Sequence, residues 1–230
     1  KDAYLVVTLS WILFSAFGAL PFLFTGSLSS FTDGFFETMS GFTTTGASII
    51  DNVEGLSHGL LFWRSMTHWI GGLGIVFFTI ALLPSLVGGT VKVFSAEATG
   101  PIKSKLHPRL STTAKWIWIV YLVLTIGCVV SFNVAGMGLF DSVNYSMGIT
   151  ATGGFSTHNT SMAYFHSPAL EYIGAFFCFA SGVNFTVLYM SAIKRDIKLL
   201  FANAEFIFYS LLVAGSIVFI AWQLIDKNHY

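Results

Sequence analysis

The strongest constraint on this chain is a Thr/Gly-rich stretch that occurs twice, each time between long apolar segments. The first copy ends in Thr43, Thr44, Thr45 and Gly46, and the second in Thr150, Ala151, Thr152 and Gly153. Alignment on the glycines pairs Gly41, Thr43, Thr45 and Gly46 with Gly148, Thr150, Thr152 and Gly153. A short polar motif repeated in the same apolar setting indicates one structural unit used twice.

The composition is that of an integral membrane protein. Of the 230 residues, 54% are hydrophobic and only 10% are charged, whereas soluble domains average about a quarter charged residues. The formal net charge is zero, so nothing indicates a nucleic-acid partner. Cys128 and Cys178 lie in apolar segments and are expected to be small packing residues, and no Cys/His cluster has metal-site spacing.

Apolar segments of two lengths alternate along the chain. A helix needs about 20 residues to cross a bilayer. The segments that meet this length are 3–24, 60–83, 116–136, 169–192 and 206–225. Pro21 is expected to kink or end the first of them.

Two shorter segments, 31–42 and 139–149, lie between paired spans. Twelve helical residues reach only ~18 Å, so each segment suits a pore helix that enters the membrane from one side and stops inside it. Thr32 or Asp33 is expected to cap the first of these helices.

The Thr/Gly-rich stretches that follow these short helices favour an ion-selectivity filter. Potassium-channel filters use backbone carbonyls in place of the water shell of the ion, and glycine lets the backbone turn those carbonyls toward an axis. The partial negative charge at a helix C-terminus favours a cation at the same place. Irregular backbone at membrane depth also needs cover from protein or water. The alternative is a Thr/Gly-rich turn between two helices.

Three further residues are candidates for the lining of a pore. Gly72 and Gly74 lie in the second span, where small residues serve either close helix packing or a bendable pore-lining helix. Asn184 lies in the fourth span, where a polar side chain needs a wet cavity or an interhelical hydrogen bond.

Four charged or titratable residues follow the first Thr/Gly-rich stretch along the chain. Arg64 and His68 lie where the second span begins, and Arg64 is expected to reach the membrane interface. Asp51 and Glu54 follow the first Thr/Gly stretch. They could enrich cations at a pore mouth, or they could be ordinary surface acids.

The distribution of positive charge predicts the orientation in the membrane. If segments 84–115 and 194–198 are cytoplasmic together with Lys1, only Arg64 and Lys227 of the eleven Lys and Arg residues are external. This agrees with the preference of positive residues for the cytoplasmic side. Both Thr/Gly stretches then lie near the external side.

The predicted fold is all-α and multi-pass, built from potassium-channel-like membrane–pore loop–membrane units. Residues 1–83 form the first unit, 84–115 a cytoplasmic connector and 116–193 the second unit. Residues 194–230 form a cytoplasmic link and the first span of a third unit.

Five stretches in the same order along the chain resemble the Trk/Ktr/HKT superfamily of potassium transport proteins, and its bacterial Trk branch in particular. They are residues 39–47, 69–75, 97–101, 153–158 and 181–184. The resemblance implies four repeats around one pore, with one filter glycine from each repeat. It assigns Gly46 and Gly153 to those positions, places the preceding carbonyls beside the ion, and implies selection of potassium over sodium.

The same resemblance implies the partners and the location. Members of the Trk type are homodimers in the bacterial inner membrane, gated by a cytosolic nucleotide-binding ring that segment 84–115 could contact. Potassium is the transported ligand, and no cofactor is implied.

The chain departs from that pattern because it has two filter-like stretches and not four. A non-Met start and a fifth span predict the N-terminal half of a longer protein, although two copies could also complete a ring. The alternatives are a non-conducting membrane assembly or regulatory subunit, and a secondary transporter with broken helices. An enzyme is not expected, because the six histidines are scattered and form no catalytic arrangement.

Overall fold

The computed structural model describes residues 2–74 and 110–228, and within those ranges the regular structure is helical. The chain divides into two compact units, residues 1–182 and 183–230, which are described separately. Segment 75–109, which contains the end of the predicted second span and most of the predicted connector, lies outside the described residues.

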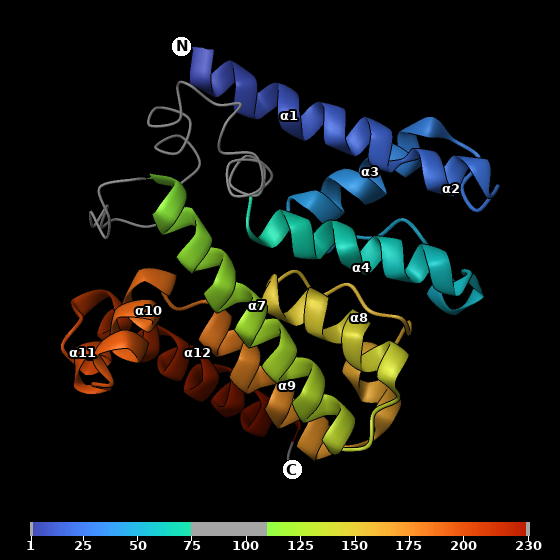
Figure 1. The fold of residues 1–230 in the computed structure, drawn as a ribbon. Helices are drawn as coiled ribbons and strands as arrows, with labels where there is room; N and C mark the ends of the chain where they lie inside the picture. Colours follow the sequence, from blue (N-terminus) through green and yellow to red (C-terminus); the bar gives the residue numbers. More distant parts are fainter. Residues whose placement is uncertain (1, 75–109, 229–230) are drawn as a thin grey trace. The chain divides into compact units, whose positions relative to one another are not determined.

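The first copy of the repeated unit is built around a short central helix. Its elements in order are α1 (Asp2–Gly18), α2 (Leu20–Phe24), α3 (Phe31–Phe42), the 3-10 turn η1 (Val53–Gly55) and α4 (His58–Gly72). Helix α3 packs against both α1 and α4 (Figure 1). Its bounds confirm the short helix predicted over 31–42.

The second copy repeats this arrangement. Its elements are α7 (Leu110–Val134), α8 (Leu139–Thr150), the 3-10 turn η2 (Ser161–Phe165) and α9 (Pro168–Ser181). Helix α8 packs between α7 and α9. The span predicted from residue 116 therefore belongs to a helix that already begins at Leu110, and the second short helix is confirmed with one additional residue at its end.

The two copies join where α4 packs against α8, as Figure 1 shows. Helix α4 also contacts α7 through two hydrogen bonds. The indole N–H of Trp69 donates to Thr125 Oγ1 at 3.0 Å, and the Tyr121 hydroxyl donates to the Trp69 carbonyl at 3.0 Å. The end of α4 is thus fixed to the second copy.

Local sequence explains where the helices begin and break. The first predicted span is interrupted at Ala19, two residues before Pro21, which lacks an N–H and whose ring crowds the preceding turn. Helix α3 is capped by Ser30, whose hydroxyl accepts from Thr32 N at 3.2 Å. The predicted caps, Thr32 and Asp33, are therefore wrong, because both residues already lie in the first turn of the helix.

A buried apolar cluster holds the second copy together. It consists of Cys128, Phe132, Met137, Tyr145 and Leu170, from α7, α8, α9 and the loop between α7 and α8. Both cysteines are free thiols, Cys128 buried and Cys178 exposed. Cys128 is thus a small packing residue, as predicted.

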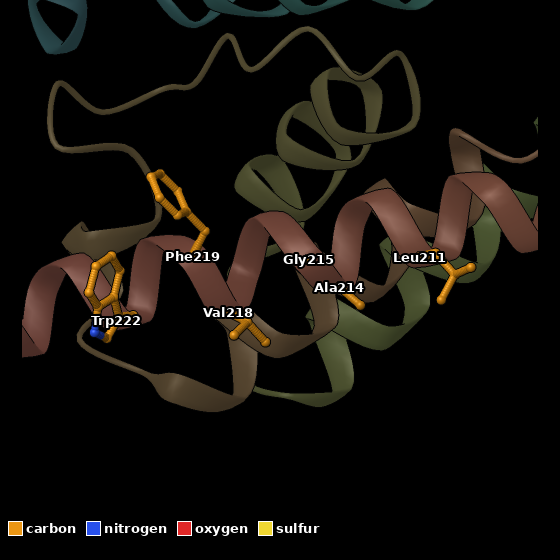
Figure 2. Close-up of a pocket in the computed structure, with 6 residues that line it drawn as sticks. All are labelled: Leu211, Ala214, Gly215, Val218, Phe219 and Trp222. Carbon is orange, nitrogen blue, oxygen red and sulfur yellow. The ribbon is translucent and has the colours of Figure 1, made fainter.

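The unit 183–230 contains α10 (Phe185–Lys194), α11 (Lys198–Phe201) and α12 (Ala204–Asn228). Helix α12 includes the predicted fifth span, and its segment Ala204–Ile225 is among three helical segments long and apolar enough to cross a membrane, with Val7–Phe24 and Trp116–Val134. Figure 2 shows six residues of α12 that line a shallow apolar pocket: Leu211, Ala214, Gly215, Val218, Phe219 and Trp222.

We predict that Gly71→Ala destabilises the protein by about 1–3 kcal/mol, the usual cost of overpacking a tight contact. A methyl group at Gly71 would overlap the Phe42 carbonyl at the end of α3. Gly59→Ala is the matched control in the same helix, because no atom lies near that position and alanine favours a helix. Thermal unfolding in detergent should separate the two variants; equal melting temperatures would contradict the close contact.

Candidate functional site

Two loops of matching backbone conformation leave the C-termini of α3 and α8. In the first loop, Thr43 N donates to Met39 O, Thr44 N to Gly41 O and Thr45 N to Ser40 O, at 2.9, 3.0 and 2.9 Å. In the second, Ala151 N donates to Met147 O, Thr152 N to Ile149 O and Gly153 N to Gly148 O, at 3.2, 2.9 and 2.9 Å. The two loops therefore have the same hydrogen-bond pattern.

The backbone angles give the same correspondence. Thr44 and Thr152 both have φ of 54°, and Gly46 and Gly154 have φ of 77° and 92°. A positive φ is costly for any residue other than glycine, so two threonines sharing it mark a conformation imposed by the surrounding fold. Gly46 thus corresponds in backbone conformation to Gly154, one residue later than the alignment on glycines indicates.

This shift changes the position assigned to Thr150. Its counterpart is Phe42, the last residue of α3, and Thr150 itself ends α8. The Thr150 hydroxyl donates to the Ser146 carbonyl at 2.7 Å and lies 3.2 Å from the hydroxyl of Thr125 in α7. Thr150 is buried as part of the helix and does not belong to the loop, whereas Gly154 does.

The two loops touch at their glycines. A methyl group added to Gly46 would overlap the carbonyl oxygen of Gly153. Thr43, Thr45, Thr152 and Gly154 are exposed, and Gly46 and Gly153 are half-buried. Both loops therefore present accessible backbone next to one another, at the ends of two helices that are themselves largely enclosed.

A buried ion pair lies behind the first loop. Arg64 Nε of α4 donates to Glu37 Oε1 of α3 at 2.5 Å, and the two side chains are 4% and 0% exposed. Glu37 also accepts from the Ser48 hydroxyl at 3.0 and 3.1 Å and from Ile49 N at 3.0 Å. One carboxylate thus fixes the chain that leaves the first loop.

Arg64 and His68 hold the second loop from the same helix. Arg64 Nη1 donates to the Ser156 carbonyl at 2.9 Å, and its guanidinium carbon lies 3.7 Å from the centre of the Phe155 ring. His68 stacks on that ring with centroids 3.9 Å apart, and Phe155 N donates to His68 Nδ1 at 3.3 Å. Phe155 is therefore held through both its ring and its backbone.

The interfacial position expected for Arg64 is wrong, because its side chain is buried, as is the side chain of His68. A buried charge needs a partner and hydrogen bonds, and Glu37 and the loop carbonyl supply them. Sequence reasoning did not identify Glu37, Ser48, Phe155 or Ser156. The signal available was an opposite charge, Glu37, in a short apolar helix near an arginine in the next span.

A second set of contacts, made by Asn159, joins the chain that follows the first loop to the chain that follows the second. The Asn159 side chain accepts from Val53 N at 2.9 Å and donates to the Asp51 carbonyl at 2.9 Å. Its backbone N donates to Glu54 Oε1 at 3.3 Å. Glu54 and the Asp51 backbone therefore help to attach the second loop to the first, and this contact is independent of any effect of their charge.

Gly72 and Gly74 lie at the C-terminal end of the described part of the first copy. A methyl group at Gly72 would lie 2.5 Å from the Tyr121 hydroxyl and 2.8 Å from Ala151 Cα, so close packing against the second loop explains this glycine. Gly74 has φ of 77° and follows the end of α4 at Gly72. The predicted continuous helix over 60–83 is thus interrupted here.

Asn184 lies at a second interruption, between α9 and α10. Its Oδ1 accepts from Thr186 N at 3.0 Å and caps α10, and its Nδ2 donates to Glu205 Oε2 of α12 at 3.1 Å. Of the two roles expected for Asn184, the interhelical hydrogen bond is the one present in the structure.

The comparisons with known proteins agree with this architecture. A family model described as "Cation transport protein", that of TrkH, matches residues 1–225. This chain belongs to the TrkH family. The TrkH-family chain is therefore a multi-pass membrane protein from a family of transporters and not of enzymes, and the Trk-type resemblance seen in its sequence is confirmed.

Individual TrkH-family relatives give the extent of the match. The chain is 40% identical over 208 residues to the Trk system potassium uptake protein TrkH of Escherichia coli K12, covering 90% of this chain and 43% of that protein. It is 38% identical over 226 residues to TrkG, a Trk system potassium uptake protein of the same organism, covering 97% of this chain and 47% of that protein. The chain thus spans less than half the length of these relatives.

A solved TrkH-family structure has the same fold. The crystal structure of the potassium transporter TrkH from Vibrio parahaemolyticus matches with a TM-score of 0.80 and 36% identity, covering 99% of this chain and 46% of that one. The all-α membrane fold predicted from the sequence is confirmed by this likeness.

We predict that Gly153→Ala and Gly154→Ala each destabilise the protein, for different reasons. A methyl group at Gly153 would lie 2.6 Å from two atoms of the His68 ring, whereas at Gly154 it meets nothing but is strained by φ of 92°. Adding His68→Ala should therefore recover part of the loss in Gly153→Ala and none of the loss in Gly154→Ala. Each loss should be about 1–3 kcal/mol.

Thermal unfolding of the four variants and of His68→Ala alone would measure this coupling. Equal rescue of both glycine variants would contradict the separate positions assigned to Gly153 and Gly154.

Proposed function

We propose that this chain supplies two of the filter loops of a potassium uptake pore. The observation that carries the proposal is the backbone conformation shared by residues 43–46 and 151–154, at the ends of two helices too short to cross a membrane. The names of the relatives, which describe potassium uptake proteins, support potassium as the ion.

The mechanism is binding rather than bond chemistry. Backbone carbonyls of the two loops replace water around a dehydrated potassium ion. The C-terminal ends of α3 and α8 add partial negative charge at the same place. In the second loop, the residues that correspond to Thr43, Thr44, Thr45 and Gly46 are Ala151, Thr152, Gly153 and Gly154. Gly154 thus replaces Gly153 as the counterpart of Gly46, and Thr150 supports the loop from the helix.

Two loops give half of the ligands that such a site needs. A potassium filter uses four loops around the ion, and a partly coordinated ion would retain an unfavourable desolvation cost. The chain spans less than half of the relatives it matches, so the other loops are proposed to come from further sequence of the same protein. Assembly from two copies of this chain is the competing arrangement.

The remaining features of the proposal follow the Trk type. The protein would lie in the bacterial inner membrane as a homodimer with its filters near the external side. A cytosolic nucleotide-binding ring would regulate it, with segment 84–115 as a contact. The positive charge of that segment and of 194–198 supports their cytoplasmic location.

Potassium rescue tests the proposal. We expect growth at low potassium when the full-length protein is expressed in cells that lack potassium uptake, and no growth with residues 1–230 alone. Membrane expression of both forms is the control. Rescue by residues 1–230 would instead support a pore assembled from copies, and failure of the expressed full-length protein would refute potassium uptake.

Substitution of the filter glycines tests the site. Gly46→Ser and Gly154→Ser in the full-length protein should each lower potassium-over-sodium selectivity, because a side chain at a positive φ displaces the adjacent carbonyls. Gly59→Ser, in open space on α4, is the control and should leave selectivity unchanged. Reversal potentials measured with potassium and sodium on opposite sides of the membrane would show the change in selectivity. Unchanged reversal potentials in both filter variants would contradict the assignment of these glycines to the filter.

A further inference from the structure

We propose that Glu37 and Arg64 are positioning residues that set the separation of the two filter loops, and thereby the discrimination between potassium and sodium. The inference rests on the proposed filter function. It assigns to a buried side-chain pair behind the loops a part of the selectivity that is otherwise attributed to the loop backbone alone.

One end of the pair is attached to the first loop. Both carboxylate oxygens of Glu37 accept from the Ser48 hydroxyl, and one also accepts from Ile49 N. These residues lie two and three positions after the filter glycine Gly46. Since Glu37 projects from α3, the helix that precedes the loop, its carboxylate fixes the exit of the loop to the body of the same helix.

The other end is attached to the second loop. Arg64 donates from Nε to Glu37 and from Nη1 to the Ser156 carbonyl, and it covers one face of the buried Phe155 ring. Ser156 and Phe155 follow Gly154 directly, as Ser48 and Ala47 follow Gly46. The planar guanidinium has several donors in a fixed geometry, so it can hold a carboxylate and a carbonyl at a constant separation.

The result is a continuous connection from the first loop through Glu37 and Arg64 to the second loop. It is the one salt bridge among the side chains that the structure describes, which lie within residues 5–74 and 116–225. Water is excluded from both side chains, which strengthens their attraction. A change in the distance between the loops must therefore stretch a buried charged interaction or break a hydrogen bond of Arg64.

The repeated fold does not itself require this pair. Tyr145 occupies the position in α8 that Glu37 occupies in α3, and its hydroxyl donates to the Ser161 carbonyl at 3.1 Å. The equivalent site in the second copy is thus filled by a neutral side chain. A buried ion pair is also a poor means of stabilisation, since apolar residues often replace one without loss. Because the ion pair contacts both loops, its role is to position them relative to one another.

The decisive variant is Glu37→Gln combined with Arg64→Met in the full-length protein. This double variant leaves no unpaired buried charge and should fold, whereas Glu37→Gln alone or Arg64→Met alone leaves the charge of its partner buried without an opposite charge. Arg64→Lys is the second variant, because it keeps a positive charge near Glu37 but lacks the guanidinium that also reaches Ser156. Glu171→Gln is the control, because Glu171 is an exposed carboxylate in the first turn of α9 and belongs to neither loop.

Reversal potentials with potassium and sodium on opposite sides are the readout, together with melting temperature and membrane expression. We expect wild type and Glu171→Gln to select potassium to the same extent. The double variant and Arg64→Lys should conduct with a potassium-to-sodium ratio lowered several-fold, because loops free to separate fit the larger ion less closely. A fall in stability alone would not move this ratio.

The inference would be overturned if the double variant conducts with wild-type selectivity. If the double variant does not reach the membrane, wild-type selectivity in Arg64→Lys would overturn it. In either case potassium conduction by wild type would leave the proposed function intact. Absence of potassium conduction by wild type would refute the proposed function itself, so the two failures are distinguishable.

Discussion

Irregular backbone at membrane depth must be covered by protein or line a water-filled cavity, and the packing around the two loops suits this constraint. Helices α3 and α8 stop after twelve residues each, and the loops beyond them carry polar groups that lipid cannot satisfy. Longer helices flank each short one, and α4 packs against α8. The cover of each loop thus comes partly from the other copy, while Thr43, Thr45, Thr152 and Gly154 remain exposed.

Hydropathy and segment length were sufficient to predict the helices, because both depend on the local pattern of residues. The positions where the helices break were harder to predict from the sequence. Helix α4 ends at Gly72 and α9 at Ser181, inside segments that read as continuous spans. Small residues are compatible with either a bend or close packing, and the neighbours of Gly72 that decide between them come from distant parts of the chain.

The correspondence between the two loops shows a second limit of prediction from the sequence. Aligning the glycines paired Gly46 with Gly153, because two consecutive glycines in the second loop leave the choice open. The identities of Asp33 with Asp141 and Met39 with Met147 already favoured Gly154, and the backbone angles agree with them. The Glu37–Arg64 pair was missed because its partners are 27 residues apart and meet only through packing of α3 on α4.

The connection through Arg64 also has a consequence for biosynthesis. Glu37 and Arg64 both precede the second loop, and Ser156 lies 92 residues after Arg64. The ion pair can close while the rest of the chain is still being made, leaving one edge of the guanidinium open. Translation thus delivers both partners of the ion pair before the loop carbonyl that Arg64 also holds.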